Sequence, residues 1–147
     1  MKRILAILAV ALAGIFAAGA QDADRIVGEY ITGHAGTSSK VRIYKASDGT
    51  YTGQVFWVKD RLDGNGKVFL DKKNPDKSLR GTPVDKVKVL WGLRYNAGKG
   101  RWDSGKVYDP SRGIKANATA SFSEDGRLKI KGSLVGISET VYWKRID

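Results

Sequence analysis

Apolar and polar residues alternate with a period of two over much of this chain. The alternation is clearest over residues 86–95, where one face carries Val87, Val89, Trp91, Leu93 and Tyr95. It recurs over residues 114–122, where Ile, Ala and Phe alternate with Lys, Asn, Thr and Ser. Because successive side chains of a β-strand point to opposite faces, the pattern predicts strands with one buried face and one solvated face.

Turn signals that contain glycine separate these segments at short intervals. Asp48-Gly49 and Asp125-Gly126 are residue pairs that two-residue hairpin turns prefer. Short strands joined by such turns indicate an all-β fold, and we predict a single eight-stranded, antiparallel, up-and-down barrel. The strands are expected at residues 25–32, 40–46, 50–59, 86–95, 101–108, 114–122, 127–134 and 138–146. A row of alanines on the inner face of the sixth strand would leave room inside such a barrel.

One connection, residues 60–85 between the third and fourth strands, is too long for a hairpin turn. Loops of this length in compact domains are usually functional or disordered. Its apolar residues and prolines predict a flap over the barrel, in which Asn74 and Arg80 offer donors to a ligand carboxylate or phosphate. The alternative is loop architecture, with Asn74-Pro75 setting a turn and Asp76 capping a short helical turn.

The first 20 residues predict a secretory signal peptide. Lys2 and Arg3 precede an apolar run that ends in Ala18-Gly19-Ala20. Cleavage after Ala20 leaves residues 21–147 as a single domain. The run is short for a transmembrane helix, and we predict no transmembrane segment elsewhere. We therefore expect a monomeric periplasmic protein, with secretion as the alternative location.

The near absence of cysteine and histidine limits the chemistry that we expect of this protein. The chain has no cysteine and one histidine, His34, in a Gly- and Ser-rich stretch that favours a solvated turn. Disulfides, thiol nucleophiles and histidine-cluster metal sites are thereby excluded. The stretch Asp63-x-Asn65-x-Lys67 places a cation where a calcium loop needs an oxygen ligand. We predict no metal and no cofactor.

The chain is strongly basic, with a net charge of +11 that falls to +9 when the predicted leader is removed. The cations are spread through nearly every strand and loop, and the predicted leader indicates export, so nucleic acid is not the expected partner. In a bacterial envelope this charge favours attraction to an anionic component such as lipid head groups or cell-wall polymers.

The first and last predicted strands carry residues that resemble a motif of the calycin superfamily, which includes the lipocalins. Gly28-Glu29-Tyr30 lies on the first strand and Arg145 on the last. In that superfamily a G-x-W packs its ring against a terminal Arg or Lys, and here Tyr30 stands in place of the Trp. The resemblance implies that Gly28, Tyr30 and Arg145 close the base of a calycin-like barrel through a cation placed over an aromatic ring.

A second resemblance covers nearly the whole chain after the leader. The segments IVGEYIT, DGTYTGQVFWVKD, DKKNPDKSLRGTPV, WDSGKVYDPSRG and VYWKR are similar to a bacterial family of exported domains known as domain of unknown function 2147. The resemblance implies a small exported β-barrel. The family brings no established activity, so it assigns no catalytic residue.

The leading functional hypothesis is a non-enzymatic periplasmic carrier or sensor that binds a small, partly apolar ligand, neutral or anionic, inside the barrel. The alternative is an envelope interaction protein whose basic outer surface binds an anionic polymer or another protein. A hydrolase that uses Asp71 and Asp109 is a third hypothesis. Asp109 precedes a proline, so it is either a turn residue or a polar group at the barrel mouth. The predicted ligand-binding residues are Trp57, Trp91, Asn74, Arg80, Trp102, Tyr108 and Asp109.

Overall fold

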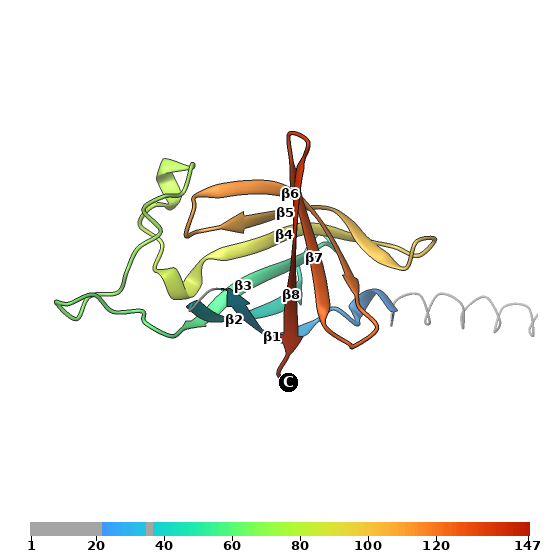
Figure 1. Cartoon of the computed structure of the whole chain (residues 1–147), viewed down its shortest axis with the longest axis horizontal. Coiled ribbons are helices and arrows are strands. Elements are labelled where there is room, and N and C mark those ends of the chain that lie inside the picture. Colours follow the sequence, from blue (N-terminus) through green and yellow to red (C-terminus); the bar gives the residue numbers. More distant parts are fainter. Residues whose placement is uncertain (1–21, 35–36) are drawn as a thin grey trace, which may run out of the picture.

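Eight antiparallel strands form a closed barrel, in which each strand pairs with its neighbour along the chain and β8 returns to β1 (Figure 1). The computed structural model describes residues 22–34 and 37–147, except for the side chains at positions 34 and 37. The strands are β1 (Gly28–His34), β2 (Thr37–Lys45), β3 (Tyr51–Val58), β4 (Lys88–Asn96), β5 (Arg101–Asp109), β6 (Ile114–Phe122), β7 (Leu128–Leu134) and β8 (Ile137–Arg145). The predicted all-β, up-and-down barrel is confirmed, and each strand begins and ends within three residues of its predicted bounds. The predicted leader lies outside the described ranges, within which no helix is long and apolar enough to cross a membrane.

Cross-strand pairing defines which side chains point into the barrel. Residues directly opposite each other in an antiparallel pair share a face of the sheet. Tyr30 pairs with Val41, Val41 pairs with Val55, and all three are buried. On β6, Ala118 and Ala120 are buried as well. The inner face is therefore apolar around the barrel, and the alanine row of β6 belongs to it.

Residues 22–26, called the N-terminal turn below, close one end of the barrel, which we call the base. Ile26 is fully buried there, and its carbonyl accepts a hydrogen bond from the Tyr30 hydroxyl at 2.8 Å. The indole N–H of Trp102 donates to the carbonyl of Ala23 at 3.0 Å. These bonds satisfy the polar atoms of two large buried rings and fix the turn across the opening.

The beginning and the end of the barrel lie side by side at the base. The backbone N–H of Ile146 donates to the carbonyl of Glu29 at 2.9 Å, and the Arg145 guanidinium donates to the carbonyl of Arg25. Strands β1 and β8 are joined by only three cross-strand pairs, whereas β7 and β8 share seven. The barrel is therefore closed by a short seam between its first and last strands.

The long segment, residues 60–85, leaves the barrel at the end opposite the base (Figure 1). It contains one 3₁₀ turn, η1 (Lys77–Leu79), and ends within a second, η2 (Val84–Lys86). Its backbone is bridged between Leu70 and Pro83. The carboxylate of Asp76 accepts the Ser78 N–H at 3.0 Å and so caps η1. The segment is thus an ordered loop with local caps of its own.

Candidate functional site

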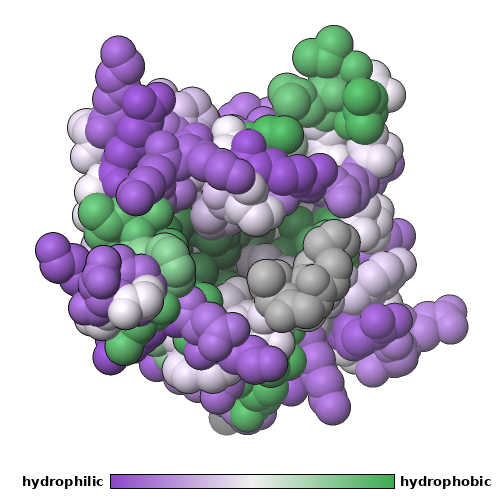
Figure 2. Space-filling view, turned by 60° about the vertical axis from the view of Figure 1, so that its left-hand side comes forward, coloured by the Kyte–Doolittle hydropathy of each residue, from purple (hydrophilic) through white to green (hydrophobic). Residues whose placement is uncertain are grey.

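The barrel end opposite the N-terminal turn, called the mouth below, is open. Figure 2 shows the molecule hollowed at its centre, with hydrophobic and neutral surface inside the hollow. Inward-facing positions of β5 to β8 remain half-buried here, although their counterparts toward the base are buried; they are Val107, Ala116, Gly132 and Val141. Because an inward side chain of a closed barrel meets solvent only through an open end, solvent enters the mouth as far as these residues.

Small side chains keep this hollow open. A Cβ atom added to Gly132 would lie 3.2 Å from Val107 Cγ1 and 3.6 Å from Ala116 Cβ, so the glycine faces into the barrel. A larger residue at position 132 would occupy the hollow. Nearer the base the interior is filled by fully buried side chains, including Val41, Ile43, Leu90, Leu93 and Leu128. The mouth is therefore a shallow apolar hollow above a packed base.

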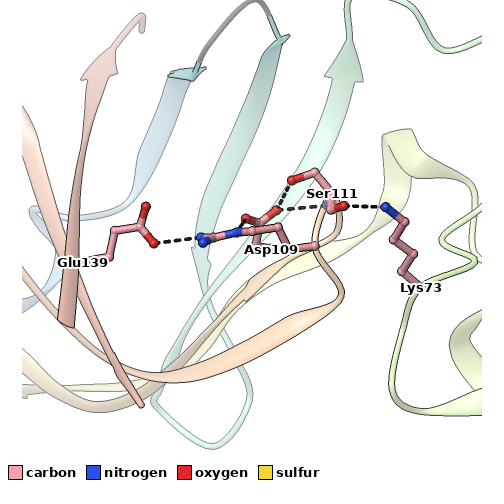
Figure 3. Close-up of polar contacts among 5 residues, drawn as sticks. Lys73, Asp109, Ser111 and Glu139 are labelled. Atoms are coloured by element: carbon pink, nitrogen blue, oxygen red, sulfur yellow. Dashed lines mark hydrogen bonds and ion pairs between the residues drawn. The ribbon is translucent and has the colours of Figure 1, made fainter. Parts of the chain in front are cut away.

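A chain of polar contacts crosses the rim of the mouth (Figure 3). Arg112, in the turn between β5 and β6, donates through Nε to Asp109 at 2.6 Å and through Nη2 to Glu139 at 2.8 Å. Glu139 lies on β8 opposite the inward glycine of β7, so it stands on the inner side of its strand. Lys73 of the long segment donates to the Ser111 carbonyl at 2.9 Å and ties the segment to the same turn.

Hydrogen bonds and ion pairing fix the charge states in this chain. Burial raises the pKa of Asp109, but hydrogen bonds from Ser111 and Arg112 outweigh burial and hold that pKa below its usual range. The bonds to Glu139 and Asp109 raise the pKa of Arg112. The Arg112 side chain is 54% exposed. A cation held between two carboxylates at an opening can exchange one of them for the anionic group of a ligand.

A pair of hydroxyl groups lies on another part of the inner rim. Thr32 of β1 pairs with the buried Trp143 of β8 and therefore points inward. Its Oγ1 atom is 2.7 Å from Oγ of Ser39, and either atom can be the donor. These hydroxyls supply donors and acceptors to the hollow. The side chain of His34, for which a solvated turn position is predicted, lies outside the described residues.

Tyr108 and Asn74 hold the long segment and do not line the mouth. Tyr108 alternates with the inward Val107, so it leaves β5 on the outer face. Its hydroxyl donates to Asp71 at 2.7 Å, and Asn74 Nδ2 donates to the same carboxylate at 2.9 Å; all three residues are buried. Burial, with Asp71 beside it, raises the pKa of the Tyr108 hydroxyl. Since Asn74 Oδ1 also accepts the Asp76 N–H, both polar atoms of the buried Asn74 side chain have partners within the long segment.

The structure also corrects the predicted flap. Gly113 has no room for a Cβ beside the Lys73 carbonyl, so the long segment packs on the β5–β6 turn. Figure 1 shows η1 beyond that turn, and in Figure 2 the hollow is visible between the surrounding side chains. Arg80 is exposed and its Nε donates to the Asn74 carbonyl at 2.8 Å, within the segment itself. Loop architecture, the alternative interpretation, describes Asn74 and Arg80 better than a ligand-gating role.

Trp57 lies on the outer face, in contrast to its predicted position inside. The β2–β3 register shifts between Lys40 and Val41, where β3 carries one extra residue. Trp57 therefore pairs with Lys40, whose ammonium lies 4.8 Å from the centre of the indole ring, and the ring is 39% exposed. A single inserted residue turns every later side chain of a strand to the other face.

Trp91 is displaced from the inner face by a similar irregularity. Between the pairs Leu90–Gly53 and Leu93–Tyr51, two residues of β4 oppose one of β3. Leu90 and Leu93 are fully buried, whereas Trp91 is half-buried and pairs with the exposed Lys106. The extra residue is accommodated at Gly92, which has a φ of 71°. Trp91 therefore belongs to the outer wall of the barrel.

Trp102 and the predicted closing residues lie together at the base. Trp102 is fully buried, with its ring 5.8 Å from that of Phe122, so it is not accessible to a ligand in the mouth. The Arg145 guanidinium lies 5.2 Å from the centre of the Tyr30 ring and donates to the Tyr30 hydroxyl at 2.8 Å. Burial raises the pKa of Tyr30, and Arg145 opposes that rise. Gly28 lies beside the same guanidinium, where a Cβ would come within 3.2 Å of Nη1.

The two carboxylates of the hydrolase hypothesis do not face a common space. Asp71 bonds to Tyr108 outside the barrel, whereas Asp109 stands at the inner rim with Arg112. The Asp63 carboxylate accepts the N–H groups of Asn65 and Lys67 and forms a tight turn. Among the described residues, no three His, Cys, Asp or Glu side chains lie close enough together to hold a metal ion.

Arg112, Glu139 and Gly132 are mouth residues that the sequence reasoning missed. Alternation on β8 contains a signal for one of them, because stepping back by two from the buried Trp143 through Val141 places Glu139 inside. Arg112 carries no such signal, because its turn position and its partner on β8 are 27 residues apart.

Comparisons with known proteins agree with the barrel. The model of a family described as "Uncharacterized protein conserved in bacteria (DUF2147)" matches residues 28–145. Among solved structures, protein HP1028 from the human pathogen Helicobacter pylori, described as belonging to the lipocalin family, is similar with a TM-score of 0.68 and 24% sequence identity over 84% of each chain. At that identity the likeness shows the fold. No curated protein matches the chain.

Proposed function

This chain belongs to the DUF2147 family, and we propose that it is a periplasmic carrier or sensor that binds a small, partly apolar ligand in the mouth of its barrel. The row of small, half-buried inner residues from Val107 to Val141 above the packed base carries the proposal. An apolar hollow with a few polar groups at its edge is the usual form of a ligand site. The lipocalin-like fold supports this reading, because an eight-stranded barrel can hold one small ligand.

The polar groups at the rim favour a ligand with a carboxylate or another anionic group. Arg112 is a cation at the rim bonded to the inward-facing Glu139, and Glu139, 51% exposed, is the partner that a ligand anion would replace. Asp109 would stay in place, so the guanidinium would keep two anionic partners. The apolar part of the ligand would lie against Val107 and Val141. Charge-assisted bonds to a guanidinium are among the stronger hydrogen bonds in proteins.

The proposal concerns binding without catalysis, in the periplasm. Asp109 has a lowered pKa and is held by Ser111 and Arg112. Such a carboxylate is suited to charge pairing and poorly suited to proton transfer near neutral pH. The predicted leader supports export, which would bring the mouth into contact with envelope metabolites.

Filling the hollow tests the proposal. Saturable binding of anilinonaphthalene sulfonate, an anionic apolar dye, and its displacement by decanoate would be measured by fluorescence. We expect Gly132→Val, and Ala116→Leu as a second filling variant, to weaken decanoate binding about tenfold or more with an unchanged circular dichroism spectrum. The matched control is Gly33→Val, because no atom lies within 4 Å of a Cβ built there. Wild-type affinity in both filling variants would show that the ligand does not bind in the mouth.

The head group is tested by a charge change at the rim. Arg112→Gln should weaken decanoate binding about tenfold or more, because it removes a charge-assisted donor. It should leave decanol, which has the same chain and no charge, within about twofold of wild type. Equal losses for the acid and the alcohol would show that Arg112 shapes the mouth without recognising an anion.

A further inference from the structure

The tip of the β7–β8 hairpin exposes three large aliphatic side chains together. Leu134 is 46% exposed, Val135 92% and Ile137 75%. Figure 1 shows the hairpin projecting beyond the rest of the barrel, and in Figure 2 it forms a hydrophobic projection at the upper right. Because β7 ends and β8 begins at the mouth, this apolar tip belongs to the mouth end of the barrel. Clustered apolar exposure of this kind commonly marks an interaction site.

The turn at the tip holds a valine in a backbone conformation that is unfavourable for its side chain. Val135 and Gly136 form a two-residue turn between the paired Leu134 and Ile137, with φ angles of 45° and 76°. Such turns prefer Asn-Gly or Asp-Gly, because β-branched residues seldom adopt positive φ. This chain has Asp-Gly in two other hairpins, at residues 48–49 and 125–126, but Val-Gly at this exposed turn. Strain held at an exposed position points to a function of the side chain.

The strands that carry the tip are basic on their outer face. Lys129 and Lys131 of β7, Lys144 of β8 and Lys115 of neighbouring β6 are all exposed. The pairing of Asn117 with Ser133 places Lys115 level with the turn. None of these four lysines forms an ion pair within the described part of the chain. The one acidic residue of β6 to β8, Glu139, is neutralised by Arg112.

We propose that the tip of the β7–β8 hairpin inserts into the surface of an anionic lipid bilayer, with Lys115 and Lys131, the two of these lysines that lie toward the tip, contacting the head groups. Aliphatic side chains that project beyond two lysines match the two layers of such a surface, which has apolar chains inside and negative charge outside. A pocket on a protein partner would match the three aliphatic residues but would give the unpaired lysines no common role. The proposal does not depend on a ligand in the barrel.

Vesicle binding by tip variants tests this proposal. Flotation with vesicles of phosphatidylglycerol and phosphatidylethanolamine would be compared with flotation with neutral phosphatidylcholine. We expect anionic vesicles to bind the protein, and the double variant Val135→Asn, Ile137→Asn to bind them at least about tenfold more weakly. Ile146→Asn is the matched control, because Ile146 is 42% exposed at the base; it should bind as wild type does.

The single variant Val135→Asn separates a membrane role from a structural one. It creates the preferred Asn-Gly turn, so we expect its melting temperature to stay equal or to rise while vesicle binding falls. A lower melting temperature with unchanged binding would overturn the proposal. Lys115→Gln and Lys131→Gln should each weaken binding to anionic vesicles about fivefold. An environment-sensitive dye on Ser133→Cys, the sole cysteine of that variant, should shift to the blue on anionic vesicles.

Other outcomes would overturn the proposal directly. One is failure of the wild-type protein to bind anionic vesicles at low salt. Another is binding by the double tip variant that equals wild-type binding. Sedimentation would show a third such outcome, a dimer that Val135→Asn dissociates and that does not bind vesicles. In that case the tip would be a contact between two copies of this chain.

Discussion

Arg145 joins three parts of the base through one side chain. Its guanidinium lies over the Tyr30 ring, donates to the Tyr30 hydroxyl and reaches the carbonyl of Arg25 in the N-terminal turn. The aromatic ring and the carbonyl both sit next to the positive charge, so the cation is stabilised although it is partly removed from water. A single residue of the last strand thereby connects the first strand and the turn that precedes it.

Replacing this guanidinium should loosen the base measurably. We expect Arg145→Ala to lower the free energy of unfolding by about 1–2 kcal/mol, because the cation–π contact and the packing of the side chain are lost together. Urea titration followed by tryptophan fluorescence measures the change. The neighbouring exposed Lys144→Ala should change stability by less than about 0.5 kcal/mol. Equal midpoints for Arg145→Ala and wild type would contradict a stabilising role for the contact.

The outcome for individual aromatic residues shows what alternation can predict. The strands themselves follow from local patterns, because alternation and Asp-Gly turns are both encoded within a few residues. The face on which Trp57 and Trp91 lie does not, since each ring lies next to an extra residue of its own strand. Such bulges arise from the fit between two strands, and a single strand read alone carries no sign of where they fall.

The long segment is held against the outer face of the barrel by hydrogen bonds. Asp71 forms its centre, receiving one hydrogen bond from Tyr108 on β5 and one from Asn74 within the segment. The sequence suggested either ligand donors or loop architecture for Asn74, and only the tertiary contact with Tyr108 decides between them. A buried carboxylate needs these donors, because an unpaired charge away from water is costly.

Removing one donor should destabilise the protein without affecting the mouth. We expect Tyr108→Phe to lower the free energy of unfolding by about 1–3 kcal/mol, since it leaves one Asp71 oxygen without its partner. Tyr142→Phe, at a ring that is 39% exposed on β8, is the control and should be nearly neutral. Chemical denaturation gives the stabilities, and dye titration should return wild-type affinity for both. A loss of dye affinity in Tyr108→Phe alone would restore Tyr108 to the ligand site.

The whole barrel is closed by one of its shortest pairings. The β1–β8 seam has three cross-strand pairs, between residues 30–32 and 143–145, whereas most other neighbours share more. Local opening of a structure starts where few hydrogen bonds and contacts hold two elements together. The seam should therefore open without unfolding of the remaining strands.

Hydrogen exchange tests this difference across the molecule. Amide protons that bond across the β1–β8 seam should exchange about tenfold faster than those around the Ile130–Val141 pair of β7 and β8, because they need only local opening. Nuclear magnetic resonance under native conditions resolves both groups. Identical protection factors would mean that the barrel opens only by complete unfolding.

The neighbourhood of β1 and β8 also determines where the chain can be cut and rejoined. The backbones of Glu29 and Ile146 are hydrogen-bonded to each other, so a short linker between the two ends would span little distance. Moving the termini to the exposed Asp48-Gly49 turn would give a circular permutant in which the seam becomes an ordinary hairpin. A fluorescent reporter joined just before residue 22 or after residue 147 would lie at the base and leave the mouth unobstructed.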